Sequence, residues 1–172
     1  MTGSGACPCC GRDVAGVERE VVFRYPDAIV GLDDVERARV YAEHGRNFAA
    51  MPGRAFVRAL LPVRLTDGHE FRFGVWLEVP EATGAAVYSA WDDPAYIDLS
   101  FDAHLANTVP PWGERLLGAA CTAVVRDVDE LPYIGSSTDE QLARVLSSPW
   151  SRTACEKLVT AVWGPLAQSD SE

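Results

Sequence analysis

The chain contains no long apolar run and few basic residues. No hydrophobic stretch approaches the roughly 18–20 residues that a membrane-spanning helix needs. The N-terminus has neither the basic region nor the apolar region of a secretory signal. We therefore expect a cytoplasmic protein with no membrane partner.

The scarcity of basic residues excludes one class of partner. The 172 residues include 15 Lys and Arg against 25 Asp and Glu, so the net charge is −10 and the pI is about 4.7. A general nucleic-acid-binding protein needs a basic face to neutralise phosphates, so we expect no nucleic-acid partner. The acidic balance fits either simple solubility or a basic protein partner attracted electrostatically.

A second Cys-x-x-Cys pair is missing. The one pair present lies in "CPCCG" at residues 7–11, where Cys7 and Cys10 have the spacing of a zinc knuckle and are the candidate zinc ligands. A closed structural site needs four ligands, and the remaining donors are scattered: Cys9, Cys121, Cys155, His44, His69 and His104. The alternatives are a capped Cys/Gly loop without metal and a thioredoxin-type redox pair, although the Gly-containing stretch that follows is a poor helix start.

The cysteine count also bears on the compartment. Five cysteines is an odd number, and the adjacent pair Cys9 and Cys10 is a poor basis for disulfides. This usage is typical of a reduced, cytosolic protein.

Nucleotide-binding and hydrolase signatures are absent as well. The chain has no P-loop, no G-x-G-x-x-G and no G-x-S-x-G. An acid–imidazole pair, Asp102 and His104, lies on one face of an alternating segment. Cys121, Ser136 or Ser137 would be its nucleophile. The alternative is a solvated strand face.

The elements that are present predict an α+β fold. We expect residues 7–165 to form a single α+β domain with a mostly antiparallel sheet of about five to six strands and three to four helices. Residues 1–6 are expected to be disordered and 166–172 to be a polar tail. The expected strands are 20–26, 54–65, 71–79, 95–107, 118–128 and 131–137, and the expected helices are 32–44, 81–91, 138–147 and 151–164.

Four residues near loops or on strand faces are candidate binding residues: Trp76, His104, Asn107 and Trp112. Aromatic side chains are common interface anchors. Trp76 belongs to such a surface if its face of the strand is exposed, and to the core if a helix covers that face.

The order of these motifs resembles a known bacterial family. "FVRALLPV" (56–63), "FRFGVWLEV" (71–79) and "DAHLANTVPPW" (102–112) follow the Cys-x-x-Cys-Gly start. The pattern is similar to the proteins catalogued as domain of unknown function 2199. The resemblance implies one folded unit and no particular activity. This chain lacks the cysteine that the family carries near residues 47–50, and Trp112-Gly113-Glu114 replaces a more usual aromatic-Pro-acid run.

These observations favour a small binding module over an enzyme. We expect a protein or small-molecule partner and a structural zinc at Cys7 and Cys10. The alternatives are a thiol-dependent enzyme at the same cysteines, a hydrolytic enzyme around His104, and an acidic inhibitor of a basic toxin. A contiguous acidic face would favour the inhibitor.

Overall fold

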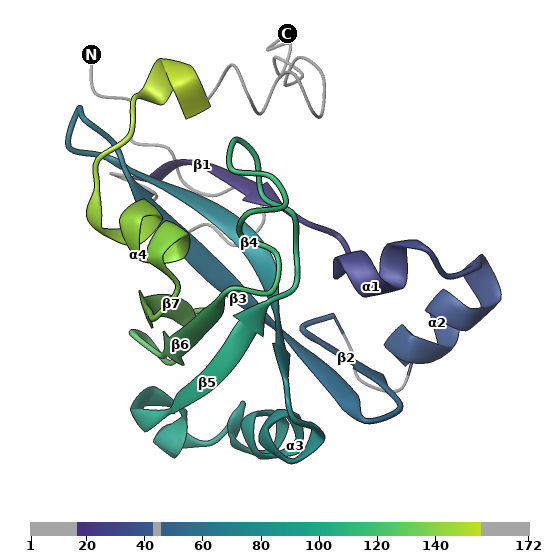
Figure 1. Cartoon of the computed structure of the whole chain (residues 1–172). Helices are drawn as coiled ribbons and strands as arrows, with labels where there is room; N and C mark the ends of the chain where they lie inside the picture. The colour runs from purple at the N-terminus through teal and green to yellow at the C-terminus, as the bar shows by residue number, and fades with distance from the viewer. Residues whose placement is uncertain (1–16, 43–45, 156–172) are drawn as a thin grey trace, which may run out of the picture.

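A computed structural model describes residues 17–42 and 46–155, which form one α+β domain (Figure 1). The cysteine loop with Cys7 and Cys10, the predicted disordered segment and the polar tail lie outside these ranges, as does most of the helix predicted over 151–164. In chain order the elements are β1 (Val17–Val22), α1 (Asp27–Val30), α2 (Asp34–Ala42), β2 (Phe48–Met51), β3 (Arg54–Arg64), β4 (Glu70–Val79), α3 (Glu81–Ala90), the 3-10 helix η1 (Pro94–Asp98), β5 (Ser100–Leu105), β6 (Ala120–Val124), β7 (Tyr133–Ser137) and α4 (Glu140–Ser147).

Five of the strands close into a small barrel. β4, β5, β6, β7 and β3 are neighbours in that order, and β3 also pairs with β4 along its whole length, so the sheet returns to its start. β1 adds to the outside of β4 and β2 to the outside of β3. Closure requires β7 to lie parallel to β3, at Leu60 and Tyr133, and β1 is also parallel to its neighbour β4. The other five pairings are antiparallel, so the prediction of a mostly antiparallel sheet is confirmed in part. It missed the two parallel pairings, which make the sheet mixed, and the closure into a barrel.

Alternation along the strands separates an inner core from an outer one. The inward-facing residues of β3 and β4, such as Val57, Leu61, Phe73 and Leu77, are fully buried in the barrel. A second cluster lies outside it, where Ile29 of α1 covers Trp76 and Phe56. The two long strands are consequently apolar on both faces over part of their length, which explains why the hairpin is so hydrophobic in sequence.

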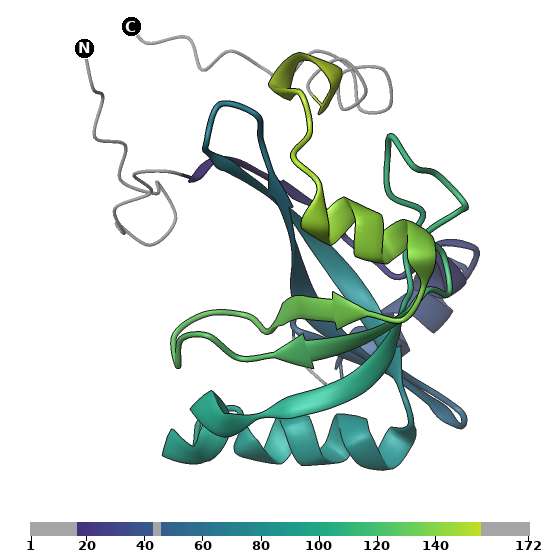
Figure 2. The same cartoon turned by 60° about the vertical axis from the view of Figure 1, so that its left-hand side comes forward.

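Helices α3 and α4 lie on opposite sides of strands β5 to β7 (Figure 2). Val87 of α3 and both Leu142 and Val145 of α4 are buried in the barrel core. None of the described helices has the length and apolar character to span a bilayer.

Aspartate side chains cap two of the helices. Asp33 caps α2, because its carboxylate accepts hydrogen bonds from the backbone N–H groups of Val35 and Glu36, each at 2.9 Å. Asp139, and not the preceding Ser137 or Thr138, caps α4 by accepting from the N–H groups of Gln141 and Leu142. The Ser137 hydroxyl instead donates to the carbonyl of Ala120 in the neighbouring strand.

Candidate binding site

Trp76 and Asn107, both proposed as binding residues, are buried. Both side chains have no solvent-exposed area. The Trp76 ring lies in the outer cluster, the Arg58 guanidinium stacks over it at 5.3 Å, and its indole N–H donates to the carbonyl of Phe23 at 3.1 Å. A helix and its flanking chain cover this face, as the alternative interpretation required.

Asn107 holds three segments together. Its Oδ1 accepts a hydrogen bond from the backbone N–H of Trp76 at 2.7 Å, and its Nδ2 donates to the carbonyl of Tyr25 at 2.9 Å and to Asp27 at 3.1 Å. The Asp27 carboxylate also accepts from the N–H and hydroxyl of Thr108. The amide thus takes the place of a strand partner where β5 ends beside β4, and this satisfies groups that would otherwise be buried unpaired.

Trp112 is half-buried beside the inner core. Its ring packs edge-on against Trp150, with centroids 5.1 Å apart, and against Phe73 at 6.1 Å. Its Nε1 is buried and has no hydrogen-bond partner within the part of the chain that the structure describes. The residue joins the barrel to the segment that follows α4.

His104 lies on the exposed outer face of β5 beside Asp102. These two residues line a shallow cleft of about 310 Å³ that Thr122, Ser136 and Ser137 also line. The Thr122 hydroxyl donates to Asp102 at 2.9 Å. The structure thus brings together the residues that the sequence proposed as an acid–base pair and its possible serine nucleophiles.

The proposed nucleophiles differ in how well they suit that role. Cys121 pairs with Ala103, so its thiol faces the barrel interior while His104 faces outward. Burial, with a smaller contribution from the charge of Asp102, raises the pKa of the Cys121 thiol to about 12, so it is a neutral thiol at pH 7. Ser137 is engaged with Ala120 and Asp139. Ser136 is the exposed hydroxyl of the group.

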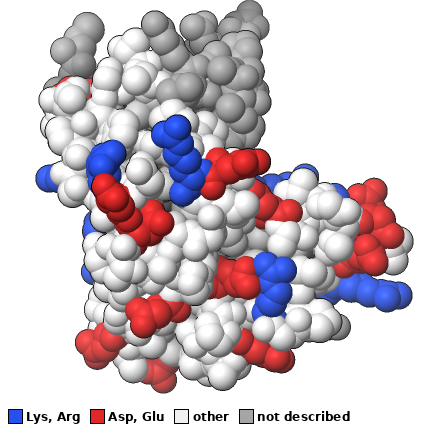
Figure 3. Space-filling view, viewed as in Figure 1, with Lys and Arg blue, Asp and Glu red and all other residues white. Residues whose placement is uncertain are grey.

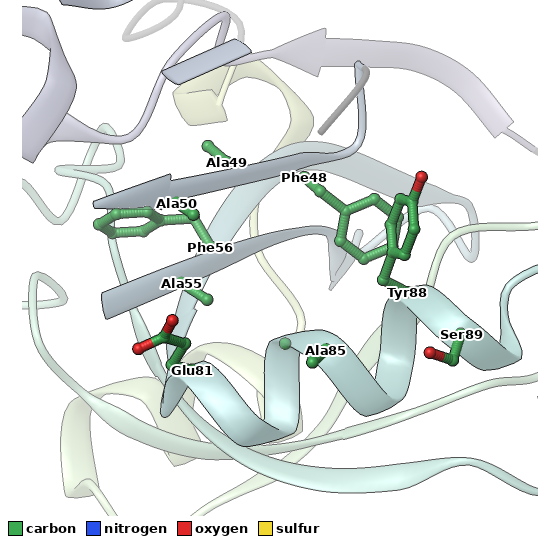
Figure 4. Close-up of a pocket in the computed structure, with 10 residues that line it drawn as sticks. Phe48, Ala49, Ala50, Ala55, Phe56, Glu81, Ala85, Tyr88 and Ser89 are labelled. Carbon is green, nitrogen blue, oxygen red and sulfur yellow. The ribbon is translucent and has the colours of Figure 1, made fainter. Parts of the chain in front are cut away.

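A groove of about 300 Å³ lies between the β2–β3 hairpin and α3. Figure 4 shows the aromatic rings of Phe48 and Tyr88 together at one end and the carboxylate of Glu81 at the other. These two rings meet edge-on with centroids 5.0 Å apart, although Tyr88 remains 55% exposed. Small residues line the space between the ends: Ala49, Ala50, Ala55, Gly84 and Ala85.

Comparison with known proteins places the chain in a family. The model of a family described as uncharacterized proteins conserved in bacteria, domain of unknown function 2199, matches residues 6–147. The chain belongs to this family. The search of curated proteins and the search of solved structures found no match.

In this family member, the motifs behind the resemblance serve the fold. Trp76 fills the outer core, Asn107 satisfies the end of β5, and Gly74 lies against Val22 of β1, whose side chain would be 3.2 Å from an added Cβ. These roles explain why the motifs predicted the family while three of the four proposed binding residues, Trp76, Asn107 and Trp112, are partly or fully buried.

An acidic surface that the motif search missed adjoins the groove through Glu81. Residues 73–114 contain seven acidic residues and neither Lys nor Arg. Within this stretch, α3, the turn that follows it, η1 and β5 expose five carboxylates, which together we call the acidic face: Glu81, Asp92, Asp93, Asp98 and Asp102. Over the lowest part of the view in Figure 3, where α3 lies, the charged side chains that can be seen are acidic and lie among uncharged residues. The absence of basic residues over this stretch was the sequence signal that could have located the surface.

The nearest acidic group outside this face is already neutralised. Glu78 of β4 receives two hydrogen bonds from Arg54, at 2.8 and 2.6 Å, and this contact lowers its pKa. In contrast, Asp92 follows the last turn of α3, which has no basic residue. The helix dipole favours a cation at the C-terminal end of a helix. A positively charged partner there would offset the unfavourable interaction between the dipole of α3 and the negative charge of Asp92.

Within the described residues no group of three or more His, Cys, Asp or Glu side chains has the geometry to hold a metal ion. The proposed ligands Cys7 and Cys10 lie outside those residues.

Proposed function

We propose that the protein is a binding module that holds a positively charged protein partner on its acidic face. The observation that carries the proposal is an open apolar groove whose α3 wall belongs to a stretch of 42 residues, 73–114, that has no Lys or Arg. The groove supplies apolar area to bury, and the carboxylates supply the charge that selects the partner.

This combination is what protein recognition requires. Interfaces bury aromatic anchors at their centre and place charged groups at the rim. Tyr88, which is 55% exposed and packs on the buried Phe48, provides the anchor, and Glu81 and Asp92 lie near opposite ends of α3. Rim charges contribute more to the association rate and to partner selection than to affinity, so binding should weaken steeply as salt is added.

An inhibitor of a basic toxin or nuclease is a narrower form of the same proposal. The exposed carboxylates of the acidic face support it, because the active sites of enzymes that act on phosphates are basic. The enzymatic alternatives have less support, since the buried thiol of Cys121 is a poor nucleophile and faces away from His104. A hydrolytic role for His104 with Ser136 rests only on their shared cleft.

A structural zinc at Cys7 and Cys10 remains part of the proposal, together with a cytoplasmic location. Its support is the spacing of the two thiols within "CPCCG". Elemental analysis of the untagged protein should find about one zinc per chain, and a Cys7→Ser/Cys10→Ser variant should lose it along with thermal stability. A metal-free protein purified under reducing conditions without chelators would refute the zinc site.

The partner proposal is tested by capture from a bacterial lysate with two variants of equal net charge. In the first, three carboxylates of the acidic face are reversed: Glu81→Lys, Asp92→Lys and Asp98→Lys. In the control, three exposed carboxylates on other parts of the molecule are reversed: Glu36→Lys, Glu114→Lys and Glu140→Lys. We expect basic proteins to be retained by the wild type and the control but lost from the face variant. Equal retention by the two variants would reject the acidic face as the binding surface.

A further inference from the structure

Within residues 17–42 and 46–155, one edge of strand β2 has no strand partner. In this part of the chain β2 is the last strand on its side of the sheet, and it pairs with β3 alone, from Phe48 opposite Val57 to Met51 opposite Arg54. The backbone N–H of Arg58 donates to the carbonyl of Asn47 at 2.9 Å. Antiparallel pairs alternate between bonded and non-bonded. Phe48 and Ala50 therefore direct their N–H and C=O groups away from β3, and no other described residue hydrogen-bonds to them.

The groove runs beside this open edge. Phe48, Ala49 and Ala50 of β2 form one wall, and Ala85, Tyr88 and Ser89 of α3 form the other (Figure 4). The small side chains Ala50 and Ala85 leave room for a second backbone beside β2. Gly84 brings α3 so near the hairpin that an added Cβ would lie 2.6 Å from the Cβ of Ala55.

We propose that β2 receives an extended segment of the basic partner as an added strand, with its main chain on the β2 edge and its side chains over α3. This inference rests on the proposed function and names its recognition mode. Strand addition uses main-chain hydrogen bonds for affinity and pockets for alternate side chains for selectivity. The pocket by Phe48 and Tyr88 takes an apolar side chain, and Glu81 pairs with a Lys or Arg of the same segment.

Charge favours a basic partner over a second copy of this chain as the occupant. Joining two copies edge to edge through β2 would bring together two chains of net charge −10, each with Glu81 beside the groove. Like-charge juxtaposition at an interface is unfavourable. A segment carrying Lys or Arg would instead place a positive charge beside Glu81, which is favourable.

The test uses a phage-displayed library of random 12-residue peptides selected on the full chain. Selected sequences should alternate apolar residues with Lys or Arg. In fluorescence anisotropy, a synthetic peptide of a selected sequence should bind at least ten-fold more weakly to Ala50→Pro, which deletes an outward N–H without touching the pairing with β3. Ala85→Trp, which fills the groove, should have the same effect. The control Ala82→Trp adds the same bulk to an exposed position of the same helix and should change Kd by less than two-fold.

The outcomes distinguish failure of the strand-addition proposal from failure of the proposed function of the acidic face. Thermal unfolding verifies that each variant is folded. If Ala50→Pro proves to be unfolded, the affinity of Ala85→Trp alone decides the test. Slower amide hydrogen exchange at Phe48 and Ala50 in the presence of the peptide would support strand addition. Affinity unchanged by both groove variants overturns it. If the Glu81→Lys/Asp92→Lys/Asp98→Lys variant nonetheless binds more weakly, the proposed function stands. A selection that enriches no sequence, or light scattering showing a wild-type dimer that Ala50→Pro makes monomeric, also overturns strand addition.

Discussion

Asn107 shows how one side chain can replace a strand. It sits where β5 ends beside β4, and its amide supplies the acceptor for the Trp76 N–H that a longer strand would have supplied. The sequence marked this residue as a candidate for binding, and the structure shows its amide bonded to neighbouring segments of the fold. A polar residue at the end of an alternating segment has the same sequence pattern whether it faces a ligand or a neighbouring backbone.

Replacing Asn107 by Ala should destabilise the protein by about 2–4 kcal/mol, because the buried hydrogen bonds that its amide makes with the Trp76 N–H and the Tyr25 carbonyl would be lost. Urea unfolding measures the change. His104→Ala, at an exposed position on β5, is the matched control and should lie within about 0.5 kcal/mol of the wild type. Equal stability of the two variants would contradict the structural role of Asn107.

The contact of Asp67 with Arg152 predicts a pH-dependent contribution to stability. The Nε of Arg152 donates to Asp67 at 2.6 Å, and this hydrogen bond is the main reason that the pKa of Asp67 is lowered to about 2. A carboxyl whose pKa is lowered on folding stabilises the folded state above its unfolded pKa, near 4, and this contribution disappears as the pH falls to about 2.

Arg152→Gln should therefore be less stable than the wild type at pH 6, and the difference should shrink between pH 4 and pH 2. Thermal melting across this range measures it. The absolute effect should be small, because the Asp67 side chain is 39% exposed and solvent screens the pair. A difference that is independent of pH would show that Arg152 acts through packing alone.

At the scale of elements, periodicity located the long hairpin and missed the short pieces. β4 alternates in sequence over residues 71–79, β3 is a long apolar run, and Asp67-Gly68 provides their turn, with Gly68 at φ 88°. α1 and β2 have four residues each, too few for a period to be recognised, and α1 has no side-chain cap. Because β2 forms one wall of the groove, the proposed site could not have been derived from the sequence pattern.

The close packing of α3 against the hairpin leads to a prediction about Gly84. Glycine weakens a helix, so Gly84→Ala in isolation should add about 1 kcal/mol of helix propensity. Here the new Cβ would lie 2.6 Å from the Cβ of Ala55. Overpacking of this kind costs about 1–3 kcal/mol, so we expect net destabilisation.

Ala55→Gly in the Gly84→Ala background should recover part of the loss, because the clash needs both methyl groups. Chemical denaturation of the two single variants and the double variant gives the coupling energy. Additive effects would show that α3 does not pack on the hairpin through these two residues.

At the scale of the whole molecule, barrel closure and the acidic face both depend on contacts between distant segments. The parallel pairing of β7 with β3 joins segments about 70 residues apart, at Leu60 and Tyr133. No local pattern encodes that pairing, so the α+β class was predictable and the barrel was not. The acidic face could be predicted in part from the sequence, because its residues lie in one stretch without Lys or Arg. That α3, η1 and β5 lie together and form one surface could be learned only from the fold.

The most direct test of the account is the amount of basic protein retained by the two charge-matched variants at low salt. Each reversed carboxylate at a binding rim should cost on the order of 0.5 kcal/mol or more. The account therefore predicts that the Glu81→Lys/Asp92→Lys/Asp98→Lys variant retains at least ten-fold less than the Glu36→Lys/Glu114→Lys/Glu140→Lys variant, which should match the wild type. A ratio near one, with both variants folded, would contradict the proposal that the acidic face holds a positively charged partner.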